Sequence, residues 1–364
     1  DVDGFGPVDD PNAIQDRRGW VGTLAATLPI NDVWTQTVSV GVFDEALTGE
    51  DPDTFFNNFE INTRTTEIAT QARLALGESK VLLGASNEER DAEVTGFGYD
   101  DSVDLTALYA QYQRGWGDRL VVTLGARWDD HSEFGGETTW RGTLSYAWAA
   151  QTRLHASFGT GFRAPALNEL FFPFFGNPDL DPERSEGFDL GVERRFLDGR
   201  LSADLTFFSN DFDDLIGVDE NFIAVNIDRA RSRGLELTLD YRVSERFQLG
   251  FSHTWDDTED RSTGAQLARR PEHRTTLDLH FEPIPALDAT LTAISVRDRV
   301  DTGGRALEDY VRVDLGLSYA LSHGVEPYLR IENLFDEDYE EIFGFGTPGF
   351  TLALGARWAW GAGR

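Results

Sequence analysis

The sequence predicts an all-β protein, more specifically a transmembrane antiparallel up-and-down β-barrel, on two observations. Apolar and polar residues alternate over many short segments, and the connections between these segments alternate between tight and long. Alternation of period two indicates strands with one apolar and one polar face, as in a barrel set between lipid and a polar lumen. Such a barrel is compatible with the mean hydropathy of -0.37. No run of about 18 apolar residues occurs, so helical membrane spans are not expected.

The alternation is clearest in residues 120–128, where apolar side chains occupy one face of the expected strand. The apolar face carries Leu120, Val122, Leu124, Ala126 and Trp128, and the opposite face carries Thr123, Gly125 and Arg127. The same division recurs in residues 235–242, 311–319 and 351–360. Aromatic residues gather toward strand ends, which suits the girdles of a membrane barrel, although core aromatics of a soluble sandwich would be the alternative. They include Trp116, Trp128, Trp148, Phe196, Phe247, Trp358 and Trp360.

The sequence predicts about 17 strands, and the connections between them alternate strictly between tight and long. This favours a membrane barrel over a sandwich, because outer-membrane barrels have short periplasmic turns and longer extracellular loops. The expected tight turns lie near Pro29–Asp32, Gly77–Ser79, Gly115–Asp118, Ala147–Gln151, Leu197–Gly199, Ser244–Arg246, Pro283–Ala286 and Ser322–Gly324. The expected long loops lie near Glu45–Asp53, Glu93–Asp101, Asp129–Glu137, Arg163–Arg184, Asn210–Glu220, Asp256–Pro271, Asp298–Asp309 and Phe335–Gly349.

The direction of the first strand predicts that part of the barrel precedes this sequence. If tight turns are periplasmic, the strand near Gly19–Leu28 runs from outside to inside, so an odd number of strands must come before it. Plugged transporter barrels have about 22 strands, which leaves roughly five strands and the plug absent from a chain that begins at Asp1 without Met. We therefore expect residues 1–364 to form a single barrel domain, with residues 162–184 as its long extracellular loop.

The charge balance excludes some partners and leaves others open. The chain has 64 acidic and 32 basic residues, a net charge of -32, so nucleic acid is not an expected partner. Solvated loops explain the acidity most simply, and calcium bound by loop carboxylates is the sharper alternative. The candidate clusters are Asp211, Asp213 and Asp214, and Asp256, Asp257, Glu259 and Asp260, but neither has the spacing of a dedicated calcium loop. No other cofactor is expected.

The sequence contains no recognisable catalytic motif. Cysteine is absent, and the six histidines are scattered without a recognisable motif among His131, His155, His253, His273, His280 and His323. An outer-membrane protease or lipase would need a nucleophile or activated water beside such partners. We therefore do not expect an enzyme.

Several short sequences occur in an order that is specific when taken together. Phe-Arg-Ala-Pro lies at 162–165, and Asn-Pro-Asp-Leu-Asp-Pro-Glu lies at 177–183. Asp214-Leu-Ile, Val225-Asn226 and the sequence Arg-Ala-Arg-Ser-Arg-Gly-Leu-Glu at 229–236 follow, and then Ile-Glu-Asn-Leu-Phe-Asp-Glu-Asp-Tyr at 331–339. Over roughly residues 101–360, this set resembles the barrels of TonB-dependent receptors.

The same sequences also have readings that are purely structural. Pro165, Pro178 and Pro182 cannot donate to a ladder and should mark where strand pairing stops. Gly234 suits a bulge or a close approach inside the barrel, and Asn333, Asp336 and Asp338 suit a turn that leaves a strand. By alternation, Arg127, Arg141, Arg153, Arg242, Arg312 and Arg357 should face the lumen with Asp104, Asp204, Asp240, Asp278 and Asp314, where ion-pair ladders are expected.

The resemblance implies a Gram-negative outer-membrane receptor that takes up a scarce metal complex, driven by the TonB protein through the missing N-terminus and surrounded by outer-membrane lipid. The implied ligand-binding residues lie at the long loop; Phe171, Phe172, Phe174 and Phe175 could instead pack on their own loop. The full set is Arg163, Asn168, Phe171, Phe172, Phe174, Phe175 and Asn177.

The residues between Phe-Arg-Ala-Pro at 162–165 and Asn-Pro-Asp-Leu-Asp-Pro-Glu at 177–183 rank the candidate ligands. Haem receptors of the family carry a His there as an iron ligand, and residues 166–176 contain none, so haem is disfavoured. Residues 167–183 look more like the cobalamin receptors, and many siderophore receptors share the second half. Cobalamin therefore ranks first, a ferric siderophore second and other metal complexes third. A passive porin remains the rival from another class, although it would usually close with fewer strands.

Overall fold

The computed structural model describes residues 12, 14–52, 58–95, 98–173, 175–219, 222–227 and 229–359. Seventeen of its strands belong to one hydrogen-bonded sheet, which confirms the all-β prediction and the expected strand number. The chain divides into two compact units: residues 1–146, 157–188 and 211–229 form the first, and residues 147–156, 189–210 and 230–364 form the second. Among the described residues, no helix is long and apolar enough to cross a membrane.

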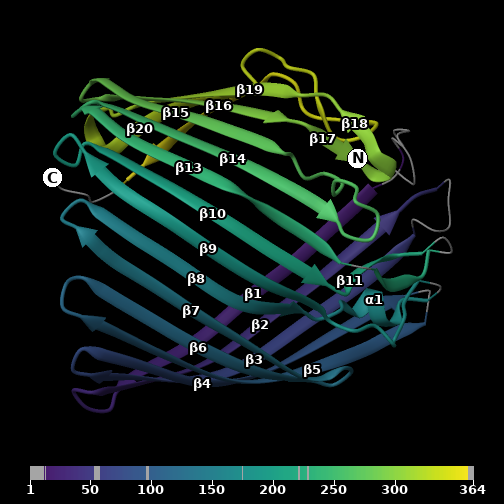
Figure 1. The fold of residues 1–364 in the computed structure, drawn as a ribbon. Coiled ribbons are helices and arrows are strands. Elements are labelled where there is room, and N and C mark those ends of the chain that lie inside the picture. The colour runs from purple at the N-terminus through teal and green to yellow at the C-terminus, as the bar shows by residue number, and fades with distance from the viewer. Residues whose placement is uncertain are drawn as a thin grey trace. The chain divides into compact units, whose positions relative to one another are not determined.

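The first unit is built on an antiparallel meander in which each strand pairs with the next along the chain, from β1 to β7 (Figure 1). The strands are β1 (Ile14–Pro29), β2 (Trp34–Glu50), β3 (Phe59–Leu76), β4 (Ser79–Thr95), β5 (Tyr99–Trp116), β6 (Leu120–His131) and β7 (Gly135–Ala149). A short helix, α1 (Leu167–Phe171), and a hairpin of β11 (Leu215–Val218) with β12 (Ala224–Ile227) also belong to this unit. The strands β8 (Thr152–Arg163), β9 (Glu183–Phe196) and β10 (Leu201–Asp213), and the last three residues of β7, divide between the two units.

The second unit is a further antiparallel meander, in which β13, β14, β15, β16, β19, β20 and β23 pair in that order. These strands are β13 (Ala230–Ser244), β14 (Phe247–Asp260), β15 (His273–Ile284), β16 (Leu287–Arg297), β19 (Tyr310–Tyr319), β20 (Val325–Glu332) and β23 (Thr351–Trp358). Two small hairpins occupy its loops, β17 (Arg299–Asp301) with β18 (Arg305–Leu307) and β21 (Glu340–Ile342) with β22 (Phe345–Gly346). Single 3-10 turns lie at Thr302–Gly304 and Ser322–Gly324.

The apolar face of the strands is exposed rather than packed into a core. Leu124 is 55% exposed, Val311 50% and Leu354 72%, although all three lie on the faces that the alternation marks as apolar. A soluble sandwich would bury these residues between two sheets. Their exposure is what a lipid-facing surface requires.

The connections confirm all eight tight turns and correct three of the long loops. Residues 45–53, 93–101 and 129–137 were expected to be loops, but pairing continues to Glu50 with Ile14, to Val94 with Tyr99 and to His131 with Gly135. The residues on both faces there are polar or charged, as in Asn-Glu-Glu-Arg-Asp-Ala-Glu at 87–93, which resembles loop composition. Backbone pairing does not need an apolar face, so the ladder extends through this charged stretch. The connection that holds Pro165 and Pro182 between β8 and β9 lies where it was predicted, whereas the loops expected from Asn210 and Asp256 begin later, because β10 extends to Asp213 and β14 to Asp260.

Gly234 shows why one position in β13 must lack a side chain. A methyl group there would overlap the carbonyl oxygen of Trp255 and come within 2.7 Å of Phe208 Cζ. Gly234 pairs in regular register with Asp256, so there is no bulge and the close approach accounts for the glycine. The prediction of a close approach is confirmed.

The strands carry ion pairs of two kinds, along single strands and across neighbouring strands. Arg127 pairs with Asp129 at 2.7 Å and Arg312 with Asp314 at 3.1 Å, each two residues along the same strand. Arg153 bonds Glu193, and Arg357 bonds Glu326 at 3.0 Å. Because side chains two apart share a face of a strand, an arginine can find a carboxylate without a partner strand having to supply it.

Candidate ligand-binding loop

The longest connection of the first unit runs from the end of β8 to the start of β9 and contains α1 (Figure 1). Pro165 and Pro182 are buried at its two ends, where their missing N–H groups leave the ladder without donors. Pairing therefore stops on both sides, and the intervening residues must be held by other contacts. Three sets of contacts hold them.

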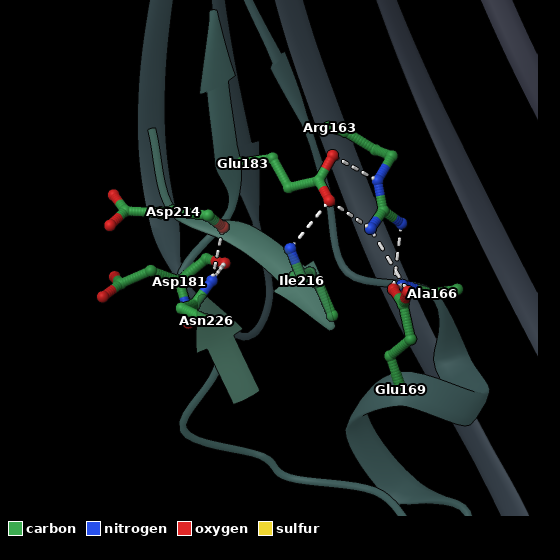
Figure 2. A network of polar contacts seen from close by, with 8 residues as sticks. All are labelled: Arg163, Ala166, Glu169, Asp181, Glu183, Asp214, Ile216 and Asn226. Carbon is green, nitrogen blue, oxygen red and sulfur yellow. Dashed lines mark hydrogen bonds and ion pairs between the residues drawn. The ribbon is translucent and has the colours of Figure 1, made fainter. Parts of the chain in front are cut away.

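Arg163 clamps the two ends of this loop together (Figure 2). Its Nε and Nη2 donate to the two carboxylate oxygens of Glu183, each at 2.7 Å. Its Nη1 and Nη2 also donate to Glu169, at 2.9 and 3.2 Å. A guanidinium that bridges two carboxylates in this way fixes their positions as well as their charge, because its planar fork matches both.

The two carboxylates also accept hydrogen bonds from backbone amides of neighbouring segments. Glu169 accepts from the amide of Ala166 at 2.7 Å, which satisfies a donor at the start of α1. Glu183 accepts from the amide of Ile216 at 2.9 Å, so the same carboxylate ties the start of β9 to β11 (Figure 2). Arg163 thus connects the end of β8, the helix, β9 and the β11–β12 hairpin in one network.

Two asparagines fasten the loop to the hairpin. Asn226 of β12 accepts from the amide of Asp181 and donates to the Asp181 carbonyl, both at 2.9 Å, and also donates to the Asp214 carbonyl at 2.7 Å (Figure 2). Asn177 donates to the Ala224 carbonyl at 3.0 Å. The amide of Ala224 donates in turn to the Phe175 carbonyl at 2.8 Å. We call this set of contacts, together with the Arg163 network, the loop latch.

An apolar cluster lies beneath the loop latch. Leu170 is 1% exposed and Leu180 4%, and they pack with Val103 and Ala224. Phe171 and Phe175 pack against this cluster, and Phe171 and Phe172 pack against a second one formed by Ala92, Val94 and Tyr99. The loop is therefore a packed substructure with its own small core.

The seven residues predicted to contact ligand lie in different surroundings. Asn168 is exposed on α1, whereas Phe171, Phe172 and Phe175 are partly buried against the two apolar clusters. Arg163 and Asn177 serve the loop latch through the bonds given above. Phe174 lies outside the described residues. No contact with a ligand is tested for any of the seven, and their role in binding stays a prediction.

The sequence analysis quoted Glu183 and Asn226 within its motifs but gave neither them nor Glu169 a role in the loop latch, of which they carry much. One signal was available for Glu169, because a Glu at the third position of a helix commonly accepts from the backbone at its start. Asn226 and Glu183 are joined to their partners across 45 and 33 residues of sequence, respectively. Such distant pairing leaves no local signal.

A second junction joins three loops of the second unit around Asp301, which is 4% exposed. Its carboxylate accepts from the amide of Phe343, from Nε of Arg269 and from the amide of Thr302, each at 2.7 Å. The Phe343 amide, together with the Arg269 and Thr302 donors, holds the pKa of Asp301 at about 2. Three loops far apart in sequence therefore share one ionised acceptor.

Arginines face the acidic clusters considered for calcium. Arg233 bonds Asp257 at 2.8 Å and Arg231 bonds Glu259 at 2.6 Å. Asp214 bonds Arg184 at 3.0 Å. In the part of the chain that the structure describes, the one grouping of three potential metal ligands is His280, Glu282 and Asp288, near a tight turn. Calcium binding remains untested.

Comparison with known proteins gives matches of sequence and of fold. The family model described as "TonB dependent receptor-like, beta-barrel" matches residues 3–334. The vitamin B12 transporter BtuB of Vibrio vulnificus is 29% identical over 257 residues, which is 65% of this chain and 39% of that protein. The BtuB of Photobacterium profundum is 27% identical over 293 residues, 77% of this chain and 47% of that protein. The chain spans less than half the length of both.

Solved structures agree in fold at lower sequence identity. A mutant of the ferric enterobactin receptor PfeA from Pseudomonas aeruginosa superposes with a TM-score of 0.77 and 20% identity, covering 93% of this chain and 61% of that one. The siderophore receptor PirA from the same organism gives a TM-score of 0.75 and 19% identity, covering 94% of this chain and 64% of that one. At such identities the likeness concerns the fold alone.

Proposed function

Because the chain belongs to the TonB-dependent receptor-like β-barrel family, a family of receptors rather than enzymes, we propose that the full-length protein is an outer-membrane receptor of a Gram-negative bacterium that imports cobalamin. The long loops bind the ligand outside, and a plug domain, acted on by the TonB partner, then releases it inward. The observation that carries the choice of ligand is the similarity to two vitamin B12 transporters over 65% and 77% of this chain.

The loop latch supports a binding role because it preorganises the loop. A loop that is ordered before binding loses less conformational entropy when the ligand arrives. Arg163 and Asn226 hold the loop through charged and amide contacts, so that Asn168 is presented on a fixed helix. Functional side chains are most effective when neighbouring residues fix them in this way.

A ferric siderophore is the second candidate, and the structural neighbours favour it. PfeA and PirA are siderophore receptors, and each covers more than nine-tenths of this chain. Charge favours the first candidate. Catecholate complexes of iron are anionic, and a net charge of -32 disfavours their approach. The periphery of cobalamin consists largely of uncharged amides, which such a surface does not repel.

The test is titration calorimetry of the full-length receptor in detergent, with cyanocobalamin and with a panel of ferric siderophores. We expect binding of cyanocobalamin, weakened by Arg163→Ala and retained by Arg119→Ala, a matched variant at an exposed position in a tight turn. Binding of a siderophore alone would move the assignment to iron uptake. Absence of binding to every ligand would overturn the receptor proposal in favour of a passive pore.

A further inference from the structure

Three side chains that can bind a metal ion gather beside the tight turn between β15 and β16. Nε2 of His280 lies 2.5 Å from Oδ2 of Asp288 and 3.8 Å from Oε1 of Glu282. One ligand atom from each residue lies within 4.8 Å of the other two, and all three residues are half-buried. Ligand atoms around a tetrahedral zinc ion, with bonds of about 2.0–2.2 Å, are roughly 3.3–3.6 Å apart. Small side-chain movements would therefore bring these three atoms into coordination distance of one ion.

An irregularity in strand pairing brings the two carboxylates together. The strands β15 and β16 pair regularly up to Phe281, and pairing resumes only at Ile284. Glu282 and the proline that follows it therefore lie opposite a single residue of β16, which is Asp288. Such a bulge bends its strand and redirects a side chain. The three ligands thus come from one hairpin of nine residues, and their arrangement does not depend on segments distant in the sequence.

The ligand atoms lack the partners that satisfy other polar groups of this unit. Nε2 of His280 is shielded from solvent and makes no hydrogen bond within the described residues, because its close contact with Asp288 lacks hydrogen-bond geometry. Across the same described ranges, the carboxylates of Glu282 and Asp288 contact no arginine, whereas Glu259 bonds Arg231. A shielded nitrogen beside a carboxylate oxygen needs a cation between them, and a proton would require hydrogen-bond geometry.

The chemistry of the three ligands favours zinc over the alkaline-earth ions. Zinc binds imidazole nitrogen and carboxylate oxygen in sites of three protein ligands with water in the fourth position. Calcium and magnesium prefer oxygen alone. Two carboxylates also balance the double charge of the ion. His280 lines a hollow of about 550 Å³ and Asp288 one of about 460 Å³, so water can reach the remaining coordination position.

We propose that His280, Glu282 and Asp288 bind one zinc ion, with water completing the coordination. The ion ties β15 to β16 at their turn, and it stabilises the folded hairpin because the ligands converge only in the folded chain. The site goes beyond the proposed function, since it requires neither a particular ligand at the long loops nor the TonB partner.

Titration calorimetry of the full-length receptor with zinc chloride tests this site. The receptor carries no histidine tag and is kept in detergent. We expect one zinc ion per receptor, and we expect His280→Ala and Asp288→Asn each to lower the affinity about tenfold or more, because even residues outside the coordination shell change metal affinity by about 10–100-fold. Calcium chloride in the same titration should bind at least about tenfold more weakly.

His155→Ala is the matched control. Nε2 of His155 lies 2.9 Å from Oδ2 of Asp204, so it also belongs to a histidine–carboxylate pair. No third ligand joins this pair in the part of the chain that the structure describes. The variant should bind zinc like the unchanged receptor.

X-ray absorption at the zinc edge keeps the proposal testable if a variant fails to fold. The unchanged receptor should show one imidazole nitrogen together with oxygen ligands at about 2.0–2.2 Å. Two or more imidazoles would place the ion elsewhere and overturn the site. Absence of saturable zinc binding, equal affinity for calcium, or zinc binding by His280→Ala equal to that of the unchanged receptor would overturn it as well. A receptor that binds zinc but neither cobalamin nor a siderophore would contradict the proposed function alone.

Discussion

Several arginines in this protein are neutralised by a carboxylate two positions along their own strand, and others, such as Arg357 with Glu326, by a carboxylate of the neighbouring strand. Arg127 with Asp129 and Arg312 with Asp314 follow this rule, and Arg330 bonds Glu332 at 2.5 Å. Arg330 and Glu332 are exposed, so their pair contributes little to stability by itself, about 0–1 kcal/mol, whereas Asp129 is buried against Arg127. Their effect is to balance charge locally, and Arg231 with Glu259 and Arg357 with Glu326 do the same between neighbouring strands.

Asp301 differs from these pairs because it is buried and accepts three bonds from three loops. Its pKa is depressed from 3.8 to about 2, so its ionised form stabilises the folded loops above its unfolded pKa. This stability is lost as the pH falls from about 4 toward 2. We expect Asp301→Asn to melt at a lower temperature than the unchanged receptor at pH 6, and the difference to shrink on acidification. A difference in melting temperature that stays constant down to pH 2 would contradict the role of Asp301.

Sequence reasoning at this scale succeeded where a residue obeys a local rule. Pro165 and Pro182 could be placed because a missing N–H ends a ladder wherever it occurs. Asn333 could be placed at a turn, and it has a positive φ of 52° with its Oδ1 accepting from the amide of Glu337 at 2.8 Å. The burial of Phe171 and Phe172 could not be decided, because their partners Ala92 and Tyr99 come from strands about 70 to 80 residues earlier.

At the scale of elements, the loop between β8 and β9 behaves as part of the β11–β12 hairpin rather than as a free connection. We expect Asn226→Ala to loosen the β8–β9 loop from the β11–β12 hairpin. The substitution removes three hydrogen bonds, whose combined loss costs roughly 1–3 kcal/mol of local stability. Hydrogen exchange of the Asp181 and Ala224 amides should accelerate about tenfold or more in this variant.

Asn168→Ala is the matched control for the loop latch. Asn168 lies on the same loop, but its side chain is exposed and has no hydrogen-bond partner among the residues that the structure describes. Exchange in this variant should resemble that of the unchanged protein. If Asn168→Ala and Asn226→Ala accelerate exchange equally, the loop is flexible by itself and is not held by the hairpin.

The positions of the elements could be predicted except where composition and pairing disagree. Tight turns such as Gly77–Glu78 could be located, because only two residues separate the alternating segments on either side. The ends of β4 to β7 could not, because charged residues on both faces look like loop while the backbone continues to pair. Contacts between loops, such as that of Asn226 with Asp181, could not be predicted either. They join segments that are distant in the sequence, and the alternation of apolar and polar residues says nothing about which loops meet.

At the scale of the whole molecule, the exposed apolar faces require a hydrocarbon environment. We expect Leu124→Arg to disfavour folding into bilayers by about 2–4 kcal/mol if this residue lies near the middle of the membrane. Leu124 is 55% exposed, so the same substitution in a soluble protein would change little. Gln111→Arg, on the polar face of the neighbouring strand, is the control and should fold normally. Folding yield into lipid vesicles measures both, and equal yields would contradict a lipid-facing surface.

β5 is longer than the membrane is thick, so part of its paired sheet extends beyond the outer surface. Its 18 residues, at about 3.3 Å each and a tilt near 45°, span about 42 Å along the membrane normal, against an apolar band of about 25 Å. Roughly 17 Å of paired sheet therefore stands above the bilayer, rich in acidic side chains. An antibody or bacteriophage approaching this region would contact a rigid wall and not a flexible peptide. Antisera raised against short synthetic peptides from residues 87–105 should consequently recognise the boiled protein and fail on intact cells.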